Sequence, residues 1–298
     1  MTSTSATPDA ARTRDLLGAW FRASGRHGLP WRRLREPYPV LVSEVMLQQT
    51  QVDRVVPYYH AWLDRWPGFA ELAAAASADV ITAWRGLGYN RRALALHAAA
   101  RAVVERHAGR FPWEPKELRA LPGVGPYTAA ALRCFVLDEP LPVLDTNISR
   151  VIARLALGQA TARDVPRSAL EAAARSFLPA QGGRDHNLAL MDLGALVCTS
   201  RTPLCGSCPV STQCRWYASG RPLPPPDRRP PAPRFEDTAR FARGRIVDRL
   251  RNGPAHKAEL SGILPPRHRP YLEAYLASLQ RDGLAVPLGP DTWALPPG

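Results

Sequence analysis

The sequence predicts a mainly α-helical protein of 298 residues that ends in a small separate module. Apolar residues recur at three- and four-residue intervals through the first 220 residues, which is the period of an amphipathic helix. No alternating apolar and polar run, the pattern of a half-buried strand, occurs before residue 280. Seven prolines between residues 220 and 234 predict an extended linker that separates this all-α body from residues 235–298.

Proline and glycine residues punctuate the periodic segments and indicate where each helix begins and ends. The predicted helices of the body cover residues 15–24, 40–49, 52–66, 79–84, 91–107, 126–137, 148–156 and 167–178. We expect residues 1–13 to form a flexible tail and residues 14–219 to form one helical core.

Residues 235–298 are expected to fold as three short helices and a terminal hairpin. The helices are predicted at 243–251, 257–264 and 271–282, and the hairpin at 284–295 with its turn at 289–291. Three helices and a hairpin are typical of a winged-helix module. Such modules bind DNA in some proteins and only pack against a neighbour in others, and the sequence favours neither alternative.

The chain carries a formal net charge of +13, and its isoelectric point is about 10.3. A surplus of this size favours a polyanionic partner, usually nucleic acid, although a solubilising surface has the same signature. Only two of the 39 basic residues are lysine. No apolar run approaches the roughly 20 residues that span a bilayer. We therefore expect a cytoplasmic, nucleoid-associated monomer without membrane contact.

Four of the five cysteines lie in one short loop broken by Pro and Gly: Cys198, Cys205, Cys208 and Cys214. Gaps of six, two and five residues let the four thiolates converge on one metal centre, either zinc or an iron–sulfur cluster. Paired zinc ligands usually come as two short Cys-x-x-Cys knuckles, and only one such pair occurs here. Four unligated thiols are the remaining alternative. Cys134 stands alone in a predicted helix and is expected to be a small core residue.

A Pro-Gly-Val-Gly-Pro turn at residues 122–126 lies between two predicted helices. Glycine lets the backbone reverse tightly, so the amides of Gly123, Val124 and Gly125 can point at an anion. Bound to a phosphate, this turn would hold DNA independently of sequence. The alternative is a connector with no ligand.

Two acidic residues lie where either chemistry or ordinary structure could explain them. Glu44 sits among apolar residues of the predicted helix 40–49, so it is either a surface residue or a deliberately buried acid. Asp145 precedes the predicted helix 148–156, so it either caps that helix or takes part in a reaction. The residues by themselves leave these alternatives open.

Four motifs, in order along the chain, resemble the helix-hairpin-helix DNA glycosylases of the endonuclease III superfamily, in its iron–sulfur branch. The motifs are residues 43–52, the turn at 121–129, residues 143–150 and the cysteine loop with its lead-in from 190. Residues 43–52 match the MutY-type adenine glycosylases nearly residue for residue, whereas endonuclease III relatives lack the glutamate. The resemblance covers about residues 14–217. It implies the family's fold of two helical lobes with a 4Fe–4S cluster loop at 198–214.

The resemblance implies a glycosylase that removes adenine mispaired with 8-oxoguanine or guanine in double-stranded DNA. Glu44 corresponds to the family's general acid, and Asp145 to the carboxylate that stabilises the sugar cation. Asn147 is expected to help orient these groups. Tyr127 stands where bifunctional relatives carry the lysine that forms a Schiff base. We therefore expect a monofunctional enzyme that leaves an abasic site.

DNA contacts are implied in the same way. Gln49 and Tyr89 correspond to residues that penetrate the duplex near the orphan base when the target base is flipped out. Trp31 and Arg32 lie in a segment that resembles the entry to the adenine pocket.

The sequence departs from the family in two places. Leu188 stands where many relatives carry a Glu or Gln that contacts adenine. Residues 235–298 are too short for the Nudix-like domain with which typical MutY proteins recognise 8-oxoguanine, so that preference rests on analogy.

Two other functions are weighed against the adenine glycosylase. The first is an endonuclease III-like glycosylase/lyase for damaged pyrimidines, and Tyr127 argues against it. The second is a non-catalytic DNA-binding scaffold, which the presence of both Glu44 and Asp145 in their full motifs argues against.

Overall fold

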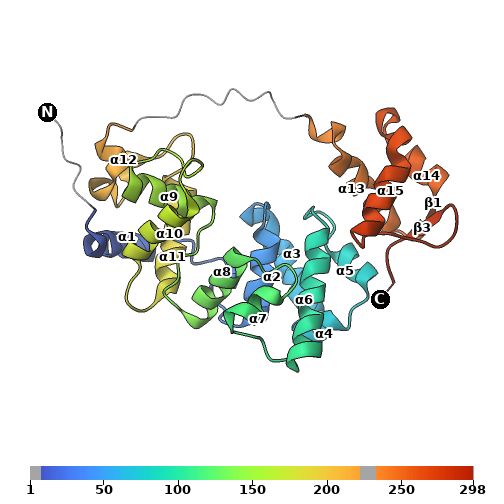
Figure 1. Ribbon diagram of the computed structural model, residues 1–298, viewed down its shortest axis with the longest axis horizontal. Helices are drawn as coiled ribbons and strands as arrows, with labels where there is room; N and C mark the ends of the chain where they lie inside the picture. Colours follow the sequence, from blue (N-terminus) through green and yellow to red (C-terminus); the bar gives the residue numbers. More distant parts are fainter. Residues whose placement is uncertain (1–7, 222–232, 298) are drawn as a thin grey trace. The chain divides into compact units, whose positions relative to one another are not determined.

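The computed structural model describes residues 8–221 and 233–297, and the chain divides into two compact units. Unit 1 comprises residues 1–40 and 125–227, and unit 2 comprises residues 41–124 and 228–298. Each unit is therefore built from two stretches far apart in the sequence. The described residues are mainly helical, as the apolar periodicity predicts (Figure 1). None of the described helices has the length and apolar character needed to cross a membrane.

Unit 1 consists of helices and helical turns in its described residues. They are α1 (Ala10–Ser24), η1 (Pro30–Arg32), α8 (Pro126–Leu137), α9 (Thr146–Leu157), α10 (Arg167–Phe177), α11 (Gly183–Asp192), η2 (Leu193–Val197), η3 (Cys205–Ser207), η4 (Ser211–Gln213) and α12 (Arg215–Ala218). Helices α1, α9, α10 and α11 pack on one another and enclose the apolar core of the unit.

The first helix starts earlier than the sequence predicts. The side chain of Asp9 accepts hydrogen bonds from the amides of Ala11 and Arg12, which is the geometry of an N-cap. Helix α1 therefore begins at Ala10 rather than at residue 15, and Thr13 is buried. The prediction of a tail reaching residue 13 is wrong for residues 10–13. The rest of that tail up to residue 7, and most of the predicted linker 220–234, lie outside the described residues.

Unit 2 contains a helical lobe and the C-terminal module. Helix α2 (Pro37–Leu47) runs from the last residues of unit 1 into unit 2. The lobe continues with α3 (Val52–Arg65), α4 (Phe69–Ala73), α5 (Ser77–Ala83), α6 (Arg91–His107) and α7 (Pro115–Ala120). Helices α4 and α5 pack against α6.

Helices α6 and α8 have the predicted bounds, whereas α4, α7 and α11 are not predicted. Helices α4 and α7 have five and six residues, too few for a period of 3.6 to be recognised. The sequence pattern does not predict α11 for a different reason. This helix is buried nearly all round, including the polar residues Arg184, His186 and Asn187, so it has no solvent-facing stripe.

The C-terminal module has the helix and strand content of a winged helix. Its elements are η5 (Phe235–Asp237), α13 (Ala239–Leu250), β1 (Ala255–His256), α14 (Lys257–Gly262), η6 (Pro266–Tyr271), α15 (Leu272–Arg281), β2 (Val286–Pro287) and β3 (Thr292–Ala294). The strands form an antiparallel sheet in the order β1-β3-β2, with Ala255 paired to Trp293 and Val286 paired to Ala294. The predicted hairpin is thus present. The expectation of no strand before residue 280 is wrong, because the two-residue β1 is too short to alternate.

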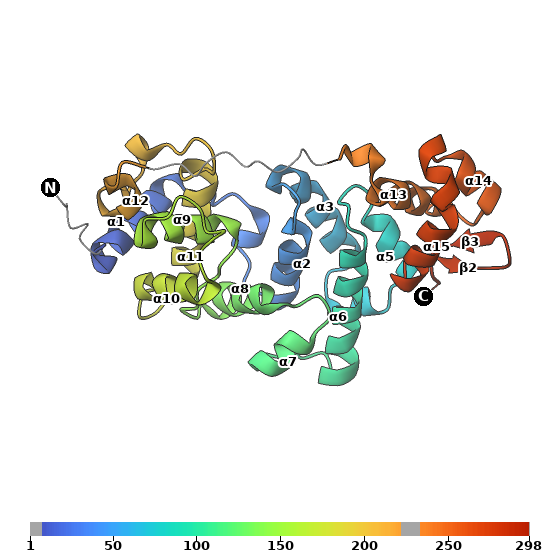
Figure 2. The same ribbon diagram turned by 45° about the horizontal axis from the view of Figure 1, so that its top comes forward.

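The module packs against the lobe of unit 2 (Figure 2). Its apolar core, which includes Ile246, Leu276 and Trp293, also takes in Ile81 from α5, and Leu94 of α6 packs against it. Of the two roles left open for a winged-helix module, packing against a neighbour is therefore present.

Candidate active site and metal centre

Asp145 lies at the N-terminus of α9 in unit 1. Its Oδ1 accepts a hydrogen bond of 2.6 Å from the backbone amide of Ile148, and its Oδ2 accepts one of 3.2 Å from Nδ2 of Asn147. Burial raises the pKa of Asp145, and these hydrogen bonds oppose the shift without cancelling it. The capping alternative is confirmed. It is compatible with a chemical role, because one carboxylate can accept the capping hydrogen bond and carry a negative charge at the same time.

Hydrogen bonds connect Asp145 to the start of the cysteine loop. The Oδ1 atom of Asn147, the partner of Asp145, accepts a bond of 2.9 Å from Nη2 of Arg150. The same Nη2 donates to the carbonyl of Gly194 at 2.6 Å, and Nε of Arg150 donates to the carbonyl of Cys198 at 2.7 Å. The N-terminus of α9 and the entry to the loop therefore hold each other in place.

Glu44 lies on α2 in unit 2, and only 8% of its surface is exposed. Its neighbours Val42, Val45 and Met46 are also buried, so α2 has no solvent face at this position. Of the two alternatives for Glu44, the structure shows the buried acid.

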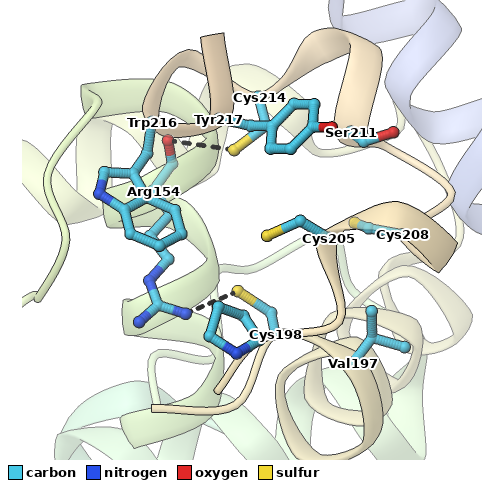
Figure 3. Close-up of a pocket in the computed structure, with 10 residues that line it drawn as sticks. Arg154, Val197, Cys198, Cys205, Cys208, Ser211, Cys214, Trp216 and Tyr217 are labelled. Carbon is cyan, nitrogen blue, oxygen red and sulfur yellow. Dashed lines mark hydrogen bonds between the residues drawn. The ribbon is translucent and has the colours of Figure 1, made fainter. Parts of the chain in front are cut away.

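The four clustered cysteines line one cavity in unit 1 (Figure 3). Val197, Pro203 and Trp216 contribute apolar walls. Burial raises the pKa of Cys208 to about 12 and also raises the pKa of Cys214.

A buried arginine supports this cavity. Nη1 of Arg154 donates to Sγ of Cys198 at 3.3 Å and to the carbonyl of Thr199 at 2.7 Å. Its guanidinium lies 4.5 Å from the ring centroid of Trp216. A cation beside these sulfurs favours their negatively charged form, which is the form that binds metals.

Within residues 8–221 and 233–297, no three His, Cys, Asp or Glu side chains lie close enough together to hold one ion. The sulfurs nevertheless share one cavity. Four thiolates are a donor set that suits either zinc or an iron–sulfur cluster.

The turn at residues 121–125 contains two glycines, Gly123 and Gly125, whose backbone lacks side-chain cover. Gly123 has a φ of +78°, and a Cβ there would lie 3.0 Å from the Cβ of Ala95, so the position favours glycine. The amide of Val124 donates to the carbonyl of Leu121 at 3.1 Å, and its side chain is buried. Gly125 is exposed and is the N-cap residue of α8. An anion at this turn would therefore bind the amides of the two glycines and of the first turn of α8, not that of Val124.

Gln49 and Tyr89 share an unusual backbone conformation in unit 2. Both are exposed, and their φ angles are +56° and +48° although neither is glycine. Arg92 connects the two turns that carry them. It donates to the carbonyls of Val45, Met46, Gln48, Leu87 and Gly88 and to the hydroxyl of Thr50. Burial lowers the pKa of Arg92 to about 10.

Trp31 and Arg32 lie in η1 of unit 1, and Trp31 is buried. The guanidinium of Arg32 donates two hydrogen bonds, of 2.6 and 2.7 Å, to the carboxylate of Asp192. Burial alone would raise the pKa of Asp192, yet hydrogen bonds from Arg32 and Arg26 lower it. Arg32 therefore has a structural partner besides any contact with a base. Leu188 is also buried.

Three arginines that organise these sites are not predicted from the sequence: Arg92, Arg150 and Arg154. Arginine is abundant throughout the chain, and no motif distinguishes these three from the exposed ones. Their role follows from contacts with residues 44 to 48 positions away, such as Gln48 for Arg92 and Cys198 for Arg150.

Comparison with protein families matches residues 42–175 to the HhH-GPD superfamily of base excision DNA repair proteins. The adenine DNA glycosylase of Mycolicibacterium smegmatis is 40% identical over 284 residues, which cover 94% of this chain and 94% of that protein. The human adenine DNA glycosylase is 41% identical over 213 residues, which cover 68% of this chain and 39% of that protein.

Two solved structures share the fold. A thermostable thymine-DNA glycosylase has a TM-score of 0.65 and 30% identity, covering 70% of this chain and 97% of that chain. Endonuclease III in a non-covalent complex with DNA has a TM-score of 0.59 and 21% identity, covering 71% and 98%, and at this identity it shows the fold alone. The predicted all-α, helix-hairpin-helix glycosylase fold is therefore confirmed.

Proposed function

Because this chain belongs to the family of adenine DNA glycosylases, within the HhH-GPD superfamily of base excision DNA repair proteins, we propose that it removes adenine from mispaired DNA. The substrate is double-stranded DNA in which adenine lies opposite 8-oxoguanine or guanine. The enzyme hydrolyses the N-glycosidic bond, acts as a monomer and leaves an abasic site. The observation that carries the proposal is Glu44, an acid buried on α2 inside the matched region.

The reaction needs a proton donor and a stabilised sugar cation. Glu44 donates a proton to a ring nitrogen of the flipped-out adenine, which makes the base a better leaving group. The bond between C1′ and the base then breaks, and its electron pair leaves with the base. The ionised carboxylate of Asp145 stabilises the positive charge on the sugar. Water adds to C1′ and loses a proton that restores the acid form of Glu44, so the products are neutral adenine and an abasic deoxyribose.

Asp145 is prepared for this role by its surroundings. The amide of Ile148 and the side chain of Asn147 hold its two carboxylate oxygens, so the group does not reorient when charge develops. Arg150 fixes Asn147 in turn. Asn147 is therefore a positioning residue in this mechanism.

The enzyme is proposed to be monofunctional. A lyase needs an amine that forms an imine with the sugar, and Tyr127, half-buried in the first turn of α8, has none. The two lysines of the chain are Lys116, exposed on α7, and Lys257, which pairs with Glu273 at 2.9 Å in the C-terminal module. Neither belongs to the matched motifs.

Several residues are proposed to hold the DNA. Gly123 and Gly125 offer amides to a backbone phosphate, which supplies affinity without specificity. Gln49 and Tyr89 enter the duplex beside the base opposite adenine, and their exposure and strained backbone support this role. Trp31 and Arg32 are proposed to lie at the adenine pocket.

We also propose that Cys198, Cys205, Cys208 and Cys214 hold a 4Fe–4S cluster. The shared cavity, its apolar walls and the hydrogen bond from Arg154 to Cys198 support this assignment. When bound, the cluster supplies a rigid cross-link within the loop 198–214 and takes no part in cleaving the glycosidic bond.

The proposal is tested by single-turnover assays on duplexes that contain adenine opposite 8-oxoguanine, guanine or thymine, and thymine opposite guanine. We expect strand breaks at the adenine of the first two duplexes only after hot alkali. Glu44→Gln abolishes them, whereas Glu36→Gln, which changes an exposed carboxylate just before α2, leaves the rate unchanged.

The other outcomes are equally informative. No cut at any adenine by the folded protein would refute the proposed function, and excision of thymine would favour a thymine glycosylase. Breaks without alkali, or a complex trapped by borohydride, would show that the monofunctional assignment is wrong.

A further inference from the structure

The C-terminal module is joined to the lobe of unit 2 by polar contacts as well as by its apolar core. Arg251 donates to the carbonyl of Ile81 at 3.1 Å and to Oδ1 of Asn90 at 3.0 Å. Arg85 donates to Oδ1 of Asp248 at 2.8 Å. Asn90 directly follows Tyr89, so this interface extends to the turn that is proposed to enter DNA.

One side chain of the module reaches Tyr89 itself. Arg240, exposed near the start of α13, donates through Nη1 to the hydroxyl of Tyr89. Its guanidinium lies 5.0 Å from the ring centroid of Tyr89 and 4.9 Å from that of Phe235. Arg92 of the lobe lies 5.5 Å from the Tyr89 ring. Two guanidinium groups, one from the lobe and one from the module, thus hold this ring.

Tyr89 needs such support. It is 40% exposed and has a φ of +48°, a conformation that non-glycine residues adopt only where their surroundings hold them. Arg92 fixes the backbone of its turn through the carbonyls of Leu87 and Gly88. The phenol ring contacts the guanidinium groups of Arg92 and Arg240, and its hydroxyl accepts a hydrogen bond from Arg240.

We propose that Arg240 is a positioning residue for Tyr89 and that the C-terminal module thereby takes part in recognising the base opposite adenine. The inference rests on the proposed function. Arg240 holds the phenol ring in the orientation in which it enters the duplex, so less rotamer entropy is lost on binding. Residues 235–298 therefore contribute to DNA recognition through the lobe on which they pack, without the length of a Nudix-like domain.

The test compares Arg240→Ala with Arg245→Ala. Arg245 is exposed on the same helix, and its guanidinium lies 5.9 Å from the ring centroid of Phe241. Arg245→Ala therefore removes the same positive charge and leaves the contacts of Tyr89 intact. Single-turnover excision is measured against protein concentration on adenine opposite 8-oxoguanine. We expect Arg240→Ala to raise the half-saturating concentration about three- to tenfold, as for loss of a cation–π contact, with the saturating rate unchanged. Arg240→Lys should recover part of the loss, and Arg245→Ala should match the parent protein.

A double-mutant cycle separates positioning from a direct phosphate contact. If Arg240 acts through Tyr89, Arg240→Ala has no further effect in a Tyr89→Ala protein. If Arg240 binds phosphate instead, Arg240→Ala weakens DNA binding equally in both backgrounds. It also lowers the salt dependence of the affinity by about one phosphate contact. The second result would overturn the inference.

A fluorescence measurement that does not depend on catalysis completes the test. In a Glu44→Gln background, 2-aminopurine next to the base opposite adenine should brighten on binding as the stack opens, and Arg240→Ala should reduce that increase. An unchanged increase would overturn the inference while leaving the adenine glycosylase intact. If neither the parent protein nor Arg245→Ala excised adenine, the proposed function itself would be wrong.

Discussion

Asp145 combines two tasks in one side chain. As the N-cap of α9 it accepts a hydrogen bond from the amide of Ile148, and as the proposed catalytic carboxylate it faces a developing sugar cation. The two tasks make different demands, because a cap needs only an acceptor oxygen whereas the reaction needs a negative charge. A substitution that keeps the acceptor and removes the charge therefore separates them.

Asp145→Asn is expected to fold normally and to lose activity. Asparagine caps a helix about as well as aspartate, so the thermal midpoint should stay within about 3 °C of the parent protein. The excision rate should fall by about 100-fold or more, because one preorganised electrostatic group is lost. Differential scanning fluorimetry and single-turnover assays measure the two effects. A large drop in the midpoint with a proportional loss of activity would show that Asp145 is only a cap.

The raised pKa of Asp145 predicts how the rate depends on pH. Burial favours the protonated carboxyl, so the active carboxylate is lost as pH falls through a value above the ordinary one of about 3.9. The sign for stability follows: ionising the buried group costs folding free energy, and this cost appears as pH rises from the ordinary pKa to the raised one. A pH–rate profile should therefore show an acidic limb at a higher pH than the ordinary pKa of an aspartate, and this limb should be absent from the residual activity of Asp145→Asn. A limb at the ordinary value would contradict the burial argument.

Among the helices, α11 shows how closely the elements of unit 1 approach. Its first residue, Gly183, has no room for a side chain, because a Cβ would lie 2.2 Å from the carbonyl oxygen of Glu139 and 2.7 Å from Cα of Pro140. These are backbone atoms that cannot move aside as a flexible side chain does. By contrast, Gly244 within α13 has nothing within 4 Å of the same position.

This contrast predicts opposite effects of one substitution. Gly183→Ala should lower the free energy of unfolding by about 1–3 kcal/mol, the usual cost of overpacking. Gly244→Ala should raise it by up to about 1 kcal/mol, because alanine is the better helix former. Thermal midpoints of the two variants against the parent protein test this. Equal shifts in the same direction would mean that the close approach at Gly183 is not there in solution.

The cysteine loop 198–214 gives a prediction with a control inside the chain. Cys208→Ser should lower the iron and inorganic sulfide content of the purified protein, because one cluster ligand is removed. Cys134→Ala should leave both unchanged, since Cys134 lies in α8 and its sulfur contacts Asn187 rather than the cavity. Chemical analysis of iron and sulfide measures the outcome. Iron-free parent protein that contains one zinc per chain would contradict the cluster.

At the scale of the whole molecule, we expect the net charge of +13 to control how the affinity for DNA depends on salt. Positive side chains displace counterions from the phosphates, so affinity falls steeply with salt. For Glu44→Gln, which leaves the duplex intact, the dissociation constant should rise by about 100-fold or more between about 50 and 200 mM salt. Fluorescence anisotropy measures it. A rise of less than threefold would show that the charge serves solubility rather than phosphate binding.

The candidate site divides into a part that local sequence encodes and a part that it does not. Asp145 and the cysteine loop are recognisable because caps and ligand spacings involve neighbours in the chain. The burial of Glu44 is ambiguous in the sequence, since apolar residues on both sides of an acid suit a buried helix and a surface helix alike. The earlier start of α1 shows a limit of another kind, because a polar segment with an N-cap at Asp9 can be a helix or a tail.

The sequence by itself determined the helical class, the bounds of α6 and α8, the close spacing of four cysteines and the helices and hairpin of the C-terminal module, because periodicity and spacing are local properties of the chain. Only the tertiary structure decided that Glu44 is buried, that Arg92 joins the turns of Gln49 and Tyr89, and that the module packs on α5 and α6. These features depend on contacts between residues distant in the chain, 44 positions apart for Arg92 and Gln48 and 151 for Arg240 and Tyr89. No local pattern encodes such a pairing, because its free energy arises only when the two segments are packed together.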